Sequence, residues 1–335
     1  MTDALHKLGL PTAVCQTPVT AAATIAFTEG PAVDADGTLY FSDIVNNRIV
    51  RRLADGAVSV FREPSHRTNG QAFDLQGRLV HCEGAEFGPG GGRRLTRTDL
   101  RSGKYEILTD RMDAPGPTDA LPLGHGGTDG RGSVRYNSPN DVCVDGQGRI
   151  YFTDPCYGDR SSMESDVEGV YRVDLNGRVT RILQQPCIER PNGIAVSQDA
   201  RKLYVVDSCP TVGGNRKIWA FELDAEGNPH GQRLVYDFAP GRGGDGIRLD
   251  QTGNLYVAAG VMTPRGPHET NRVPPGVYVL RPDGTLLGRI AVPEDLITNL
   301  AFGGSDGCTI YITAGKSVYT TRVSIAGQVA YPKWK

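Results

Sequence analysis

Long apolar runs are missing from this sequence. No stretch of its 335 residues approaches the apolar length, about 18 residues, that a transmembrane helix needs. Residues 1–14 also lack the basic segment and apolar core of a secretory leader. We therefore expect a soluble protein that stays in the cytoplasm and has no membrane partner.

Clusters of one charge sign are missing as well. The chain carries 36 Lys and Arg against 38 Asp and Glu, a formal charge of −2, and aromatic residues make up only 7%. Proteins that bind nucleic acid present a basic patch, which this distribution does not supply. The balance argues against a nucleic-acid partner and favours a small molecule.

Three motifs that would define a chemical class are absent. The seven cysteines include no Cys-x-x-Cys pair, so most are expected to be small buried residues. No Gly-x-Ser-x-Gly elbow is present, which argues against a serine hydrolase. The glycine-rich stretch at 88–92 leads into another strand-like run rather than a helix, so it does not indicate a nucleotide-binding fold.

What the sequence does have is glycine, proline and a repeat. Glycine (43) and proline (22) are abundant, and short Val, Ile, Tyr and Phe runs alternate with Asp-Gly turns, a pattern typical of all-β proteins. One unit recurs, as in residues 190–208: an acid or amide opens a short apolar run, a polar turn follows, and a second strand-like run often ends on an acid. The first residues of the six copies, here called the anchors, are Glu29, Asn69, Asn140, Asn192, Asp245 and Asn299.

Units of four strands, repeated every 40 to 50 residues or so, are typical of a β-propeller. We predict an all-β, six-bladed β-propeller that forms a single domain over residues 1–335. The sixth copy shows only three strand-like runs, and we expect an N-terminal segment at about 13–25 to supply the fourth and close the ring. In such a ring all anchors face one mouth of the central channel, where loops wall a pocket.

The anchors are two carboxylates and four amides. Their oxygens suit a hard divalent cation in a central metal site, above all Ca²⁺, with Mn²⁺, Mg²⁺ and Zn²⁺ as alternatives. Zinc is disfavoured because no His or Cys is among the anchors. A second interpretation stays open, since Asn and Asp before glycine are also ordinary turn residues.

Four phrases carry a resemblance to a known family. FTEGPAVDADGTLYFSDI, SPNDVCVDGQGRIYFTDPCYG, RPNGIAVSQDARKLYVVDS and GGDGIRLDQTGNLYVAAG resemble the regucalcin/gluconolactonase (SMP-30-like) family of six-bladed propeller lactonases. The resemblance spans about residues 27–325. It implies that Glu29, Asn192 and Asp245 bind the metal, with Asn140 as a fourth position near both metal and substrate. It also implies that Asp245 is the general base and that Asp141 orients the substrate.

The sequence thus predicts a hydrolase that opens a sugar lactone or related small lactone. The cation polarises the carbonyl, and Asp245 takes a proton from the attacking water. Arg94 is a further candidate for binding a substrate hydroxyl or carboxylate. Two alternatives stay open: a phosphotriesterase-like hydrolase that uses the same metal site, and a non-catalytic calcium-binding propeller. Residues 112–134 are an insertion relative to the family, so the identity of the lactone does not follow from the resemblance.

Overall fold

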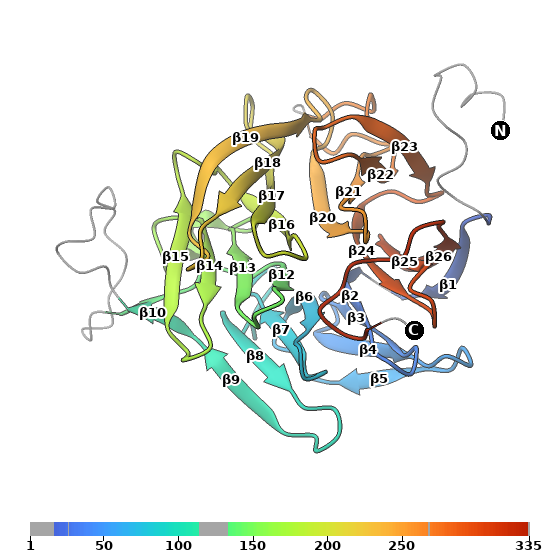
Figure 1. The fold of residues 1–335 in the computed structure, drawn as a ribbon, viewed down its shortest axis with the longest axis horizontal. Coiled ribbons are helices and arrows are strands. Elements are labelled where there is room, and N and C mark those ends of the chain that lie inside the picture. The colour runs from blue at the N-terminus through green and yellow to red at the C-terminus, as the bar shows by residue number, and fades with distance from the viewer. Residues whose placement is uncertain (1–16, 26, 114–132, 267–268, 334–335) are drawn as a thin grey trace.

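The computed structural model describes residues 17–25, 27–113, 133–266 and 269–333, which form an all-β ring. Six antiparallel sheets of four strands surround a central axis like the blades of a propeller (Figure 1). Apart from a 3-10 turn at Arg160–Ser162, the described residues contain no helix, and so none that is long and apolar enough to cross a membrane. The predicted all-β, six-bladed architecture is confirmed.

Each blade runs from an inner strand at the channel to an outer strand at the rim. The first blade consists of β2 (Thr28–Val33), β3 (Leu39–Asp43), β4 (Arg48–Arg52) and β5 (Val58–Arg62), and the second of β6 (Thr68–Phe73), β7 (Leu79–Glu83), β8 (Arg94–Thr98) and β9 (Tyr105–Thr109). The third consists of β12 (Val142–Val144), β13 (Ile150–Asp154), β14 (Gly169–Val173) and β15 (Val179–Gln184), and the fourth of β16 (Pro191–Val196), β17 (Lys202–Ser208), β18 (Arg216–Leu223) and β19 (Pro229–Asp237). The fifth consists of β20 (Gly244–Leu249), β21 (Leu255–Ala259), β22 (Gly276–Leu280) and β23 (Leu286–Ala291), and the sixth of β24 (Ile297–Gly303), β25 (Thr309–Ala314), β26 (Ser317–Arg322) and β1 (Thr20–Thr24).

The sixth blade combines both ends of the chain. Its outer strand β1 pairs antiparallel with β26, so the sheet order is β1-β26-β25-β24. The expectation that an N-terminal segment closes the ring is therefore confirmed. Because the first and last strands share one sheet, main-chain hydrogen bonds hold the ring shut.

The turns between the first two strands of a blade are built alike. Asp34 Oδ1 accepts hydrogen bonds from the backbone N–H groups of Asp36 and Thr38, both at 2.9 Å, and Gly37 adopts a φ of 78° that favours glycine. Asp145 makes the same pair of bonds in the third blade. These turns depend on neighbouring residues only, which is why the repeat is visible in the sequence.

The insertion predicted at 112–134 begins and ends in a short hairpin. Its strands β10 (Arg111–Asp113) and β11 (Ser133–Arg135) pair antiparallel, and Figure 1 shows β10 at the outer rim. The residues between them lie outside the described part of the chain. The base of the insertion thus stands at the rim rather than over the channel.

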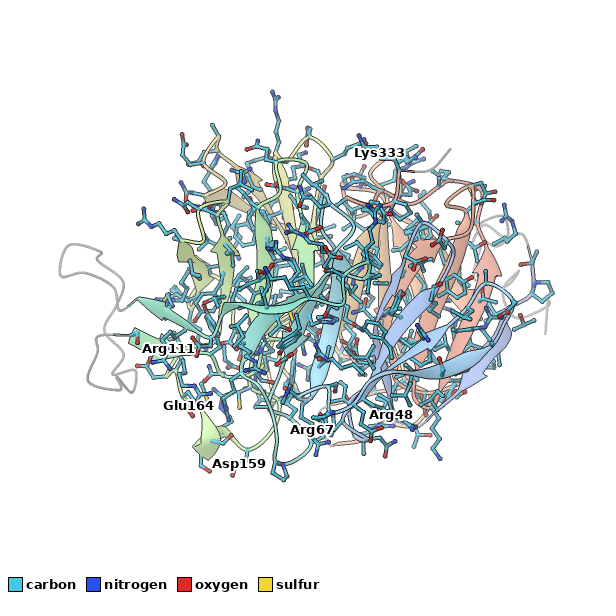
Figure 2. The ribbon with its side chains drawn as sticks, turned by 90° about the horizontal axis from the view of Figure 1, so that it is seen from below. Arg48, Arg67, Arg111, Asp159, Glu164 and Lys333 are labelled. Atoms are coloured by element: carbon cyan, nitrogen blue, oxygen red, sulfur yellow. The ribbon has the colours of Figure 1, made fainter. Side chains whose placement is uncertain are left out.

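The two mouths of the channel differ. Figure 2, a side view of the ring, shows Arg67 and Asp159 at one face and Lys333 at the opposite face. At that opposite mouth the C-terminal segment, residues 327–331, crosses the channel from the fifth blade to the second. Gln328 donates its backbone N–H to the Leu249 carbonyl at 2.8 Å, and the ring of Tyr331 packs against Phe73 with centroids 5.7 Å apart.

Candidate active site

Five of the six anchors line one cavity at the mouth opposite the C-terminal segment. The cavity measures about 190 Å³, and the anchors in its wall are Glu29, Asn69, Asn140, Asn192 and Asp245. Asn299, the sixth anchor, is not in the wall, but its Nδ2 donates to Glu29 Oε2 at 3.3 Å. The chain therefore brings oxygen donors from five blades to one place.

The glycine that follows an anchor explains how closely the inner strands converge. A Cβ on Gly193 would stand 2.2 Å from the carbonyl oxygen of Asp245 in the next blade, and one on Gly30 would stand 2.0 Å from that of Asn69. Any other residue would push two inner strands apart. The acid-glycine and amide-glycine pairs of the repeat thus set the spacing of the site.

The two anchor carboxylates share a buried, negatively charged environment. Burial, and then the charges of Asp245 and Asp141, hold the pKa of Glu29 well above its usual range. Burial also raises the pKa of Asp245 to about 6, although Arg242, whose Nη2 lies 2.6 Å from Asp245 Oδ2, opposes the rise. Both carboxylates would be stabilised as anions by a cation between them.

Two polar atoms in the cavity wall are buried without a hydrogen-bond partner among the described residues. They are Asn69 Oδ1 and the hydroxyl of Tyr157. A buried polar atom left unpaired costs about 1–3 kcal/mol, so native proteins usually pair such atoms with protein, water or a ligand. Their position in this wall makes the cavity a candidate site for a polar ligand.

The donor set fits a hard divalent cation. Carboxylate and amide oxygens, without a thiol or imidazole, are the ligands that Ca²⁺ and similar ions prefer. Within the described ranges no group of three or more His, Cys, Asp and Glu side chains is placed to hold a metal. A cation here would therefore take amide oxygens, such as those of Asn140 and Asn192, together with the carboxylates of Glu29 and Asp245.

Two residues predicted to bind the substrate lie outside the cavity wall. Asp141 forms a paired salt bridge with Arg248 across the channel, with N···O distances of 2.9 and 3.2 Å. Arg94 bonds Glu83, which stands directly opposite it on the neighbouring strand, with its Nε 2.6 Å from Glu83 Oε2. The cavity thus gathers the four predicted metal-binding residues but neither Asp141 nor Arg94.

The wall also contains residues that the sequence analysis did not single out. Glu86 and Tyr157 come from the loops after β7 and β13, and the backbone N–H of Tyr157 donates to Glu86 Oε1 at 3.3 Å. Arg242 comes from the turn before the fifth anchor. Their loops could be found from the sequence, because the segments 84–93 and 155–168 are long and lie at the mouth that the anchors face. Which of their side chains enter the cavity depends on loop conformations that the repeat does not specify.

The fold and the cavity define a class: a six-bladed propeller with an oxygen-lined pocket at one mouth. The sequence profile of the SMP-30/Gluconolactonase/LRE-like region matches residues 27–316. A gluconolactonase from Zymomonas mobilis is 31% identical over 331 residues, covering 91% of this chain and 81% of that protein. The chain belongs to the SMP-30/gluconolactonase/LRE-like family.

Solved structures agree with this assignment. A gluconolactonase from Xanthomonas campestris is 27% identical and superposes with a TM-score of 0.71, over 94% of this chain and 98% of that one. The calcium-binding protein regucalcin from Agrobacterium tumefaciens shares the fold, with a TM-score of 0.68 at 20% identity over 95% of this chain and 98% of that one.

Proposed function

We propose that this protein is a lactonase that uses a divalent cation, calcium above all, to open a sugar lactone or a related small lactone. The observation that carries the proposal is the convergence of Glu29, Asn140, Asn192 and Asp245 on one buried cavity. The similarity to gluconolactonases along most of the chain supports the choice of substrate class. The chemistry of the donors supports the choice of cation.

Glu29, Asn192 and Asp245, with Asn140 as a fourth donor, are the residues that would hold the cation. When bound, the cation supplies Lewis acidity to the lactone carbonyl and offsets the negative charge that develops on its oxygen. The protein's own contribution is a fixed arrangement of these oxygens, because they stand on inner strands packed against each other or, for Asn140, just before one.

Asp245 is the residue we assign as general base. Arg242 bonds its Oδ2 at 2.6 Å, and the side chain of Asn192 also hydrogen-bonds the carboxylate. The carboxylate is thus fixed at the wall of the cavity, and we assign Oδ1 as the oxygen that accepts a proton as water adds to the carbonyl carbon. The bond to the ring oxygen then breaks, that oxygen gains a proton, and a hydroxy acid results.

The cavity also has an apolar side. Phe27, Ile44 and Phe87 line it, and the rings of Phe27 and Phe87 pack with centroids 5.2 Å apart. The C–H face of a small substrate ring can pack against this apolar side, while the polar groups of the substrate face the anchors. The wall therefore suits a compact, partly polar cyclic substrate.

A panel of lactones, followed by acid release with a pH indicator, tests the proposal. We expect turnover of at least one sugar lactone, loss of activity with a chelator, and recovery with Ca²⁺ in preference to Mn²⁺, Mg²⁺ or Zn²⁺. Activity that resists the chelator would refute the metal-dependent mechanism. Turnover of phosphotriesters but no lactone would favour the phosphotriesterase alternative, and calcium binding without any turnover would favour a binding propeller.

A further inference from the structure

Glu86 is a carboxylate in the cavity wall that neither the repeat nor the mechanism above uses. It lies on the loop between β7 and β8 of the second blade, while Asp245 lies on the fifth blade. In a ring of six blades the second and fifth stand opposite each other, as Figure 1 shows. The two carboxylates therefore reach one cavity from opposite blades.

The loop that carries Glu86 is held in place by its neighbours. Ala85 donates its backbone N–H to Ser138 Oγ at 2.9 Å, and Gly84 donates to the Arg67 carbonyl at 3.1 Å. Tyr157 then donates its backbone N–H to Oε1 of Glu86 at 3.3 Å. Within the described ranges Oε2 has no hydrogen-bond partner, so one carboxyl oxygen is positioned and the other remains available to a ligand.

The surroundings of Glu86 favour its protonated form. Burial, and then the charges of Asp245 and Glu168, raise its pKa to about 7, although the N–H of Tyr157 and the guanidinium of Arg190 oppose the rise. At neutral pH a large fraction of this side chain therefore carries a proton. A buried carboxylic acid of this kind is suited to act as a general acid.

We propose that Glu86 is a catalytic residue that gives a proton to the ring oxygen as the lactone opens. This role rests on the proposed function. Water adds to the carbonyl carbon and loses a proton to Asp245; the bond between that carbon and the ring oxygen breaks, and the ring oxygen takes the proton of Glu86. Asp245 then loses its proton and Glu86 regains one through solvent, so both groups return to their starting forms.

The basicity of the leaving group gives this role a chemical reason. A sugar alkoxide is a strongly basic leaving group, and its departure is slow unless it is protonated as it leaves. Asp245 takes its proton from the attacking water, while the leaving oxygen needs a proton from another group. Glu86, a second carboxyl group in the same cavity wall, supplies it.

The Glu86→Gln variant tests the role, because the amide keeps the size of the side chain and an acceptor for Tyr157 but is not an acid. On a sugar lactone we expect kcat to fall about 100-fold with little change in KM. The wild-type loss of activity as pH rises through about 7 should disappear in the variant. On dihydrocoumarin, whose phenoxide leaves easily, the variant should keep most of its rate.

Glu164→Gln is the matched control, since Glu164 lies on the same face of the ring but its side chain is 42% exposed (Figure 2). This control should behave as the wild type. Unchanged kcat and pH profile in Glu86→Gln would overturn the role of Glu86 alone. Equal losses on both substrates would overturn it as well, because a purely structural role does not depend on the leaving group. Failure of the wild-type protein to open any lactone would instead refute the proposed function.

Discussion

Replacing Gly193 with alanine should damage both the fold and the site. The added methyl group would lie 2.2 Å from the carbonyl oxygen of Asp245 and 2.9 Å from the Gly246 Cα, whereas ordinary contact begins at 3.4 Å. The fourth and fifth inner strands must therefore separate by about 1 Å, and overpacking of this kind costs about 1–3 kcal/mol. For a domain of this size we expect Tm to fall by roughly 1–4 °C.

The same separation moves Asn192 away from Asp245. A displacement of about 1 Å in a catalytic arrangement costs on the order of 100-fold in rate, so kcat/KM should fall by that factor even in the folded variant. Calorimetry and the lactone assay measure the two effects separately. Gly146→Ala, where the new methyl would have its nearest neighbour at 3.5 Å, should change neither. A Gly193→Ala protein with wild-type Tm and activity would refute the reasoning.

Three further outcomes follow from the site. Asp245→Asn should lower kcat by about 100-fold or more while the fold is kept. The control Asp166→Asn, at an exposed position, should have no effect on kcat. Near-normal activity of Asp245→Asn would exclude Asp245 as the base. Calcium at about 100 times its Kd should stabilise the wild type by about 2.7 kcal/mol over the chelated protein in calorimetry, and Glu29→Gln should lose most of that shift. Folding raises the pKa of Asp245 from 3.8 to about 6 in the protein without metal. With chelator present and at pH values between these two, the folded protein therefore binds a proton that the unfolded chain has lost. The stability of the wild type should therefore fall relative to Asp245→Asn as pH rises from 4 to 7, and a flat difference in Tm would contradict the assigned pKa.

The blades could be predicted because their signals are local. The hydrogen bonds of the Asp34 turn involve only residues up to Thr38. The strands on either side are recognised from their short apolar runs, which can be read without any distant contact. Ring closure by β1 could be expected because the sixth copy lacked one strand. The convergence of the anchors followed from their common place in the repeat.

The rest of the cavity wall depends on contacts between distant residues. The loop of Glu86 is positioned by Ser138, which is 53 residues from the backbone group that it binds. The repeat pattern of the sequence does not predict such a bond. The place of Glu86 and Tyr157 in the cavity wall is therefore visible only in the structure. Arg94 is a candidate for binding the substrate in the sequence, and in the structure its guanidinium bonds Glu83, its partner across the strand pair.

The C-terminal segment across the second mouth has a kinetic consequence. Gln328 ties it to the fourth and fifth blades and Tyr331 to the second, so it lies over the mouth of the channel opposite the candidate active site. We therefore expect the substrate to enter, and the product to leave, through the mouth that the anchors line. The hydroxy acid has to leave before the next lactone enters, and we expect it to act as a competitive inhibitor of its own formation.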